Sequence, residues 1–202
     1  MAEVLMKAGA FVAVIIMGNL LRRAGFFKEE DFYVLSKIVL KITLPAAIIS
    51  NFSGIDLKPS MLVMTLLGFG GGILYITMAF FMSIGKEREE RAFNVLNLPG
   101  YNIGNFTMPF AQSFLGPVGV VATSLFDTGN AFVCLGGAYS VAVVTKEKNA
   151  RFSLLPVVKT LLKSLPFDAY LIMTVLSFLH VALPAPITSF TGVIGNANAF
   201  MA

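Results

Sequence analysis

The sequence is poor in charged residues. Asp, Glu, Lys and Arg make up 13% of its 202 residues, whereas about 25% is usual in a soluble domain. A globule with so few charged side chains would lack the polar surface that water requires. A lipid bilayer accepts exposed Leu, Ile, Val and Phe side chains, and apolar residues make up 56% of the chain. The composition therefore predicts an all-α membrane protein with a polytopic helical bundle.

Cysteine and histidine are nearly absent. Cys134 is the single cysteine, which excludes a disulfide framework within the chain and a cysteine-based zinc site. His180 is the single histidine, and its position near the end of an apolar run favours a structural role. No spacing of His, Cys and Glu suits a metal site, and no nucleophile lies beside a base. The sequence therefore predicts neither an enzyme nor a resident cofactor.

Basic residues exceed acidic ones only slightly, 15 against 11. In a soluble protein this excess can indicate a nucleic-acid partner, but here the basic side chains lie in short loops between apolar runs. Three alternate loops hold eleven of them, and the other loops hold only Lys58. Because cytoplasmic loops are enriched in Lys and Arg, the pattern predicts a multi-pass protein of the cell membrane with its N-terminus outside and no nucleic-acid partner.

The apolar runs are long enough to cross the hydrocarbon core, which takes about 20 helical residues. A seventh run begins near Ile187 and is still apolar at Ala202, so the chain looks truncated within it. A re-entrant or interfacial terminal segment is the alternative. The complete spans are predicted at Val4–Leu21, Phe32–Phe52, Met61–Ile84, Ala92–Leu115, Val118–Val144 and Pro166–Leu183.

A basic and apolar stretch precedes the sixth predicted span. Between residues 146 and 165, Leu, Val and Phe are interleaved with Lys and Arg. This pattern is typical of an amphipathic helix that lies on the inner leaflet with its basic side outward. A tilted start of the sixth span is the alternative.

The predicted span Ala92–Leu115 contains helix-breaking residues. Pro109 has no N–H and clashes with the carbonyl of Asn105, and Pro99 with Gly100 weakens the helix further. We expect a break near Asn105, where the start of the second half-helix would present free N–H groups to an anion. A packed proline kink is the alternative. The predicted substrate-binding residues are Asn102, Gly104, Asn105, Thr107 and Pro109.

Asp127 lies near the middle of the fifth predicted span. A carboxylate at that depth costs roughly 2.5–3.5 kcal/mol, so it should face the interior of the bundle. With Asn130 beside it, Asp127 is the candidate for binding a coupling proton or sodium ion, and a purely structural hydrogen bond is the alternative. Lys41, in the second span, can pair with Asp127 or attract an anion, or it can extend to the membrane interface.

Several segments resemble the auxin efflux carrier family, which also includes bacterial dicarboxylate carriers. The similarity lies in Ile15–Phe27, Leu35–Ala46, Asn102–Pro109 and Phe126–Asn130. It implies an inverted-repeat fold, in which two five-helix repeats each contain a broken crossover helix. It also implies that residues 1–145 form the first five-helix transmembrane repeat, 146–165 a cytoplasmic connector, and 166–202 the incomplete start of the second repeat.

The resemblance also implies a function. It indicates a secondary active transporter of small organic anions, auxin-like or dicarboxylate compounds, that works by alternating access. The expected partners are the anionic substrate and the lipid bilayer, and a homodimer is left open. A cation-coupled carrier similar to the bile-acid symporters and a non-transporting membrane scaffold are the alternatives.

Overall fold

The computed structural model describes residues 2–53, 55–147 and 155–201, and every regular element in these ranges is helical. The prediction of an all-α membrane protein is confirmed. Among the described residues, three helical stretches are long and apolar enough to span a membrane: Asp31–Phe52, Pro59–Met82 and Met108–Phe132.

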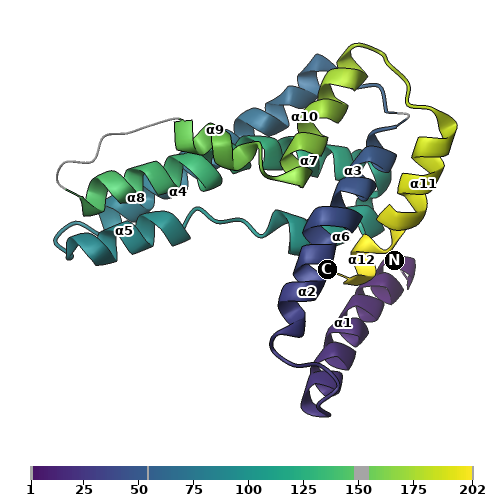
Figure 1. Cartoon of the computed structure of the whole chain (residues 1–202), viewed down its shortest axis with the longest axis horizontal. Coiled ribbons are helices and arrows are strands. Elements are labelled where there is room, and N and C mark those ends of the chain that lie inside the picture. Colours follow the sequence, from purple (N-terminus) through teal and green to yellow (C-terminus); the bar gives the residue numbers. More distant parts are fainter. Residues whose placement is uncertain (1, 54, 148–154, 202) are drawn as a thin grey trace.

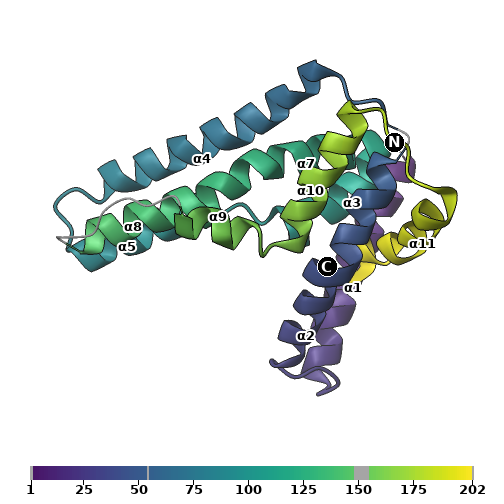
Figure 2. The ribbon, with the colours of Figure 1, turned by 45° about the horizontal axis from the view of Figure 1, so that its top comes forward.

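The helices form two groups that meet at α7 (Gly116–Phe132) (Figures 1 and 2). One group extends to the left in Figure 1 and consists of α4 (Val63–Met82), α5 (Arg88–Asn97), α8 (Ala138–Lys146) and α9 (Leu155–Leu161). The other group consists of α1 (Ala2–Arg23), α2 (Asp31–Ile38), α3 (Leu44–Phe52), α10 (Leu165–Phe178), α11 (Ala185–Asn196) and α12 (Asn198–Met201). Since α7 packs on α4 and also on α3 and α10, it joins the two groups.

The second predicted span is one continuous helical stretch, in which α2 passes into the π-helical turn η1 (Val39–Thr43) and then into α3. Pro45 is the second residue of α3, separated from this turn by Leu44. A π turn widens the helix locally, which relieves the clash between a proline ring and the carbonyl before it. The helix therefore accommodates Pro45 with a π turn and is not interrupted there.

The fourth predicted span is interrupted. Helix α5 ends at Asn97, residues 98–102 are not helical, and the chain becomes helical again at the π turn η3 (Ile103–Thr107). The short helix α6 (Met108–Phe110) and the π turn η4 (Ala111–Leu115) continue from η3 without a gap. The predicted broken helix is confirmed, but the break lies at residues 98–102 and not near Asn105. Pro99 and Gly100 occupy the break, whereas the π turn accommodates Pro109.

Glycines let α4 and α7 approach each other closely. A methyl group on Gly68 would lie 2.0 Å from the carbonyl oxygen of Phe126, and one on Gly129 would lie 2.0 Å from that of Thr65. Neither position can therefore hold a side chain at this separation. Gly116, with a φ of 63°, marks the end of η4 and the start of α7.

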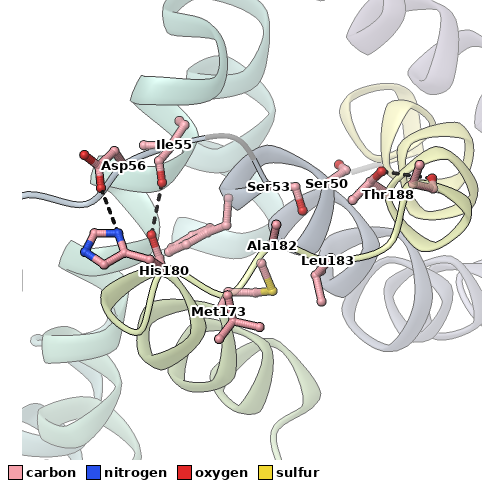
Figure 3. Close-up of a pocket in the computed structure, with 13 residues that line it drawn as sticks. Ser50, Ser53, Ile55, Asp56, Met173, His180, Ala182, Leu183 and Thr188 are labelled. Atoms are coloured by element: carbon pink, nitrogen blue, oxygen red, sulfur yellow. Dashed lines mark hydrogen bonds and ion pairs between the residues drawn. The ribbon is translucent and has the colours of Figure 1, made fainter.

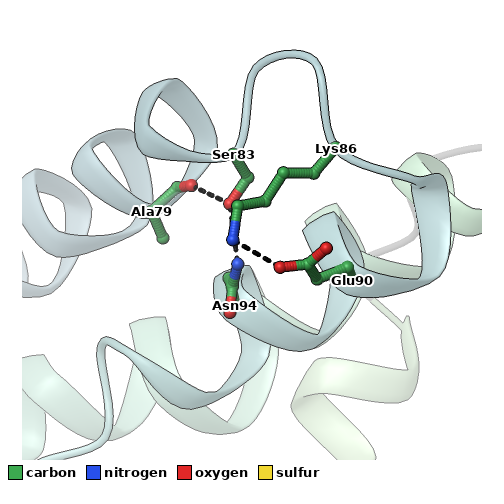
Figure 4. A network of polar contacts seen from close by, with 5 residues as sticks. All are labelled: Ala79, Ser83, Lys86, Glu90 and Asn94. Atoms are coloured by element: carbon green, nitrogen blue, oxygen red, sulfur yellow. Dashed lines mark hydrogen bonds and ion pairs between the residues drawn. The ribbon is translucent and has the colours of Figure 1, made fainter.

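Polar contacts close the turn between α4 and α5 (Figure 4). The Ser83 hydroxyl donates to the Ala79 carbonyl at 2.7 Å and accepts a hydrogen bond from the Asn94 amide at 3.0 Å. Lys86 pairs with Glu90, and both side chains are about half exposed. Exposed pairs of this kind contribute about 0–1 kcal/mol, so the turn is stabilised mainly by buried Ser83.

The last helices cover the side of α3. Gly195 of α11 contacts the backbone of α3, where an added methyl group would lie 2.6 Å from the Ala47 Cα atom. Thr43 donates to the buried amide oxygen of Asn198 at 3.0 Å. Helix α9 belongs to the predicted amphipathic connector, but residues 148–154 of that connector lie outside the described residues. The division into repeats stays a prediction.

Candidate functional site

A cavity of about 280 Å³ lies between the broken helix, α7, α10 and the second span. We call it the Asp127 cavity. No Lys, Arg or His belongs to its lining within the described part of the chain. Its lining combines polar groups from the break and from α7 with apolar side chains from the second span and α10. The lining residues are Leu40, Leu44, Tyr101, Asn102, Ile103, Gly104, Asp127, Asn130, Ala131, Cys134, Ser164, Pro166, Phe167 and Tyr170.

Both carboxylate oxygens of Asp127 accept hydrogen bonds. The Asn130 amide donates to one oxygen at 3.1 Å, and the Tyr170 hydroxyl donates to the other at 3.0 Å. Asn130 lies one turn further along α7, so that contact is local. Tyr170 belongs to α10, so its contact joins two helices that are distant in sequence. These two donors offset part of the cost of placing a carboxylate between helices.

The thiol of Cys134 forms part of the cavity wall. Its sulfur lies 2.8 Å from the Pro99 carbonyl oxygen and 2.9 Å from the Asn130 amide oxygen. A thiol has a single proton, so it donates to one of these acceptors at a time. The contact connects η5 (Val133–Gly137) with the break at residues 98–102.

The helix that begins at Ile103 points its first turn into this cavity. The N–H of Thr107 donates to the carbonyl of Asn102 at 3.2 Å, across five residues. The N–H groups before Thr107 precede this first bond, because a helix start leaves its first donors without intrahelical partners. Ile103 and Gly104, which carry two of these N–H groups, line the cavity. The start of the helix after the break and Asp127 therefore line the same cavity.

The structure brings together only part of the predicted site. Asn102, Gly104, Asp127 and Asn130 line the Asp127 cavity. Thr107 is exposed and Pro109 is buried, and neither belongs to the lining. The side chain of Asn105 lies outside what the structure describes. The roles of all these residues in binding stay predictions.

Lys41 does not pair with Asp127 as the sequence analysis allowed. Its side chain is exposed, it does not line the cavity, and no ion pair joins it to Asp127 in the described ranges. The residue lies in η1, whose neighbouring Leu40 faces the cavity instead. A role for Lys41 in attracting an anion stays a prediction.

Sequence reasoning missed Tyr170, Tyr101 and Cys134. Tyr170 is buried, and a buried tyrosine hydroxyl usually has a hydrogen-bond partner. A carboxylate within a span needs a donor in the same way. The signal available in the sequence was that the Tyr170 hydroxyl needs an acceptor and the Asp127 carboxylate needs a donor. The sequence does not show, however, that the helices carrying these two residues are neighbours.

Further cavities lie elsewhere among the described residues. One of them, of about 590 Å³, is lined by residues of α3, α10 and α11, of the segment after α3, and of the segment between α10 and α11 (Figure 3). We call it the His180 cavity. Another, of about 380 Å³, lies beside the turn of Figure 4. No group of three or more His, Cys, Asp and Glu side chains that could hold a metal ion occurs among the residues searched, which are those the structure describes.

A helical membrane protein with a polar cavity at a broken helix is the kind of molecule that carries solutes. A family model described as "Membrane transport protein" matches residues 4–151 of the chain. The chain belongs to this family of transporters, so the resemblance to auxin efflux carriers is confirmed. No curated protein and no solved structure matches the chain significantly.

Proposed function

We propose that the protein is a secondary active carrier of small organic anions, and that the Asp127 cavity is its substrate site. In this proposal the chain crosses the plasma membrane several times with its N-terminus outside, and the cavity opens alternately to the two sides. The observation that carries the proposal is that Ile103 and Gly104, at the start of the helix after the break, line the same cavity as Asp127.

The carboxylate of the substrate would bind at the start of the helix that begins at Ile103. Free N–H groups and the helix dipole favour an anion there by about 0.3–1 kcal/mol, and by up to about 2 kcal/mol in a partly buried site. The Asn102 side chain lines the same cavity and can add a further donor. The aromatic rings of Tyr101 and Phe167 offer an apolar surface to the rest of the molecule.

Electrostatics require that Asp127 be neutral when the anion is bound. At an effective dielectric constant of about 20, two negative charges about 5 Å apart repel each other by about 3 kcal/mol. This repulsion exceeds the gain from the helix start. A proton or a sodium ion on Asp127 removes it, and the substrate then moves together with that cation.

The test is uptake into proteoliposomes that contain the full-length protein, with malate, malonate and indole-acetate as substrates and an inward proton gradient. We expect Asp127→Asn, which mimics the protonated acid, to reduce gradient-driven accumulation by more than about tenfold. Asp168→Asn, on α10 but outside the cavity lining, is the matched control and should leave uptake unchanged. Undiminished gradient-driven accumulation by Asp127→Asn would remove Asp127 from the coupling step.

Cys134 gives an independent measure of occupancy, because it is the only cysteine of the chain and lines the cavity. A bound substrate should slow the reaction of this thiol with a maleimide severalfold, and Asn102→Ala should weaken the protection. Protection without uptake would indicate a binding protein or scaffold instead of a carrier. Uptake that follows a sodium gradient and ignores pH would identify the coupling ion as sodium.

A further inference from the structure

A further cavity, of about 490 Å³, lies between the end of α1 and the start of α2, at the tip of the molecule that points downward in Figures 1 and 2. We call it the Arg22 cavity. Its volume is in the range of cavities that bind small ligands. It combines two cationic and two anionic side chains with aromatic rings and a glycine. The lining residues are Gly18, Arg22, Phe27, Lys28, Glu29, Asp31, Phe32, Tyr33 and Leu35.

The charged side chains of the Arg22 cavity do not pair with one another. In the described ranges no ion pair joins Arg22, Lys28 or Glu29 to an oppositely charged side chain. Asp31 is partly occupied, because its Oδ2 atom accepts the backbone N–H of Lys28 at 2.8 Å. This bond fixes the turn at the start of α2 and does not involve the Lys28 ammonium group. The cavity therefore offers separate positive and negative groups to a ligand.

The balance of charge decides which class of ligand fits. Two positive and two negative side chains sum to zero, so a simple anion would be repelled by the carboxylates as well as attracted by the cations. A zwitterion avoids this conflict, because each of its charged groups meets side chains of the opposite sign. Arginine binds phosphate through paired N–H donors, and a carboxylate accepts the N–H donors of an ammonium group. The cavity therefore suits a phosphate that is linked to a primary ammonium group.

The surroundings of the cavity are those of a membrane interface. Phe26 and Phe32 are 71% and 63% exposed, which suits lipid better than water. Tyr33 is 72% exposed, and tyrosine is enriched where a bilayer meets water. At the other end of the cavity, Gly18 lies one helical turn before Arg22, and no atom of another described segment lies within 4 Å of a methyl group added there. The cavity therefore extends from its charged side chains toward the apolar part of α1.

We propose that the Arg22 cavity binds the headgroup of phosphatidylethanolamine. The phosphate accepts hydrogen bonds from Arg22 and Lys28, and the ammonium group donates to Glu29 and Asp31. The glycerol group lies beside Gly18, and the acyl chains continue along the apolar surface of α1. In the orientation proposed above, the lipid belongs to the inner leaflet, because the basic residues of this turn mark it as cytoplasmic. The binding itself requires neither that orientation nor transport.

Lipid titration of the purified, delipidated full-length protein in detergent, followed by native mass spectrometry, tests the site. The probes are phosphatidylethanolamine, phosphatidylglycerol and phosphatidylcholine with the same acyl chains, and soluble phosphoethanolamine. We expect phosphatidylethanolamine to bind about tenfold or more tightly than phosphatidylglycerol, equivalent to about 1.4 kcal/mol. Phosphatidylcholine should also bind less tightly, because its trimethylated nitrogen has no N–H to donate to a carboxylate. Soluble phosphoethanolamine should bind most weakly, because it lacks acyl chains.

Two substitutions separate the two halves of the site. Arg22→Gln should weaken the binding of phosphatidylethanolamine and of phosphatidylglycerol about tenfold, because both lipids carry the phosphate. Glu29→Gln should weaken only phosphatidylethanolamine and should strengthen phosphatidylglycerol, because it removes a negative charge beside the anion. Arg23→Gln and Glu30→Gln are the matched controls, since each removes the same charge from an adjacent residue outside the lining. All four side chains are exposed, so the variants should keep the fold.

Equal affinity of the wild type for phosphatidylethanolamine and phosphatidylglycerol would overturn the proposal. Effects of Arg22→Gln and Glu29→Gln no larger than those of their controls would overturn it as well. Binding of soluble phosphoethanolamine as tight as that of the lipid would identify a water-soluble ligand and refute the lipid site. None of these measurements needs a transported substrate, so their failure would leave the proposed carrier function standing, and a failure of uptake would leave the lipid site standing.

Discussion

The second span and the broken fourth span contain the same local pattern with different outcomes. In each, a five-residue π turn ending in threonine precedes a residue and then a proline: η1 before Leu44 and Pro45, η3 before Met108 and Pro109. The second span is continuous through its π turn. The fourth is interrupted before its π turn, at residues 98–102.

The comparison shows that a single proline leaves these helices continuous, whereas a proline next to a glycine interrupts the helix. A π turn absorbs Pro45 and Pro109 within a helix, so neither residue interrupts the chain. Pro99 and Gly100 stand together and interrupt it, because helix propensity opposes both residues at once. The second span and the segment that begins at η3 are also in contact, since Gly104 of η3 lies against the Leu44 and Leu40 side chains. The Asp127 cavity lies where the interrupted segment meets the continuous one.

The largest expected effect comes from repairing the break. Replacing Pro99 and Gly100 by alanine together favours a continuous helix by about 4 kcal/mol, from about 3 for proline and about 1 for glycine. A continuous helix would withdraw the free N–H groups from the cavity. We expect uptake of the anion to fall by more than about tenfold, measured in proteoliposomes.

Pro45→Ala is the control for this change, because it removes a proline from the segment that is already continuous. It should reduce uptake far less than the Pro99→Ala, Gly100→Ala variant. Equal loss of uptake in both would show that the break is not what makes the binding site.

A smaller effect, on thermal stability, is expected to distinguish Thr43 from Thr107, the last residues of the two π turns. Thr43 is buried and donates to the Asn198 amide oxygen. Thr107 is exposed, and its hydroxyl oxygen lies 3.4 Å from the Asn102 carbonyl oxygen. Thr43→Val leaves a buried acceptor without a donor, which costs about 1–3 kcal/mol. It should lower the melting temperature by roughly 2–4 °C for each kcal/mol. Thr107→Val should change stability by no more than about 0.5 kcal/mol.

Thermal unfolding of the purified protein in detergent measures both variants. Equal melting temperatures for the two would contradict the packing of Asn198 against the π turn of the second span.

The smallest effect is expected at Gly104, where the two segments touch. An added methyl group would lie 3.0 Å from the Leu44 Cδ2 atom, which is the end of a flexible side chain and can shift. Gly104→Ala should therefore leave the melting temperature nearly unchanged and weaken substrate binding severalfold by narrowing the cavity. Thiol protection of Cys134 as a function of substrate concentration measures the affinity.

Gly195→Ala is the contrast, because its methyl group would meet the backbone of Ala47 at 2.6 Å and cannot be accommodated by a side-chain shift. It should lower the melting temperature clearly. A destabilisation by Gly104→Ala as large as that by Gly195→Ala would contradict the soft contact with Leu44.

The positions of the helices could be predicted from the sequence because apolar runs and prolines are local signals. The expected span Phe32–Phe52 agrees with Asp31–Phe52 within one residue. The exact place of the break in the fourth span could not be predicted. A π turn relieves the clash between Pro109 and the preceding carbonyl, and the sequence contains no pattern from which a π turn could be predicted. The Tyr170–Asp127 hydrogen bond was equally hidden, since it depends on which helices become neighbours.

Only part of the polar lining of the Asp127 cavity could be identified from the sequence, and the reason is again that polar residues are conspicuous only within apolar runs. Asn102, Asp127 and Asn130 are conspicuous as polar residues inside apolar runs. Tyr101 and Cys134 are common residues in apolar runs and do not stand out there. They line the Asp127 cavity only because they lie in or beside the break.

The glycine contact between α4 and α7 restricts how the protein can move. With the backbones touching at Gly68 and Gly129, the two helices have no space in which to slide past each other. In the alternating access that we propose, α4 and α7 would move as one rigid unit, and Asp127, two residues before Gly129, would move with them. Tyr170 belongs to the opposite group of helices. Their hydrogen bond therefore joins the two groups of helices, and in the alternating access that we propose, a movement of one group relative to the other would have to break and re-form it.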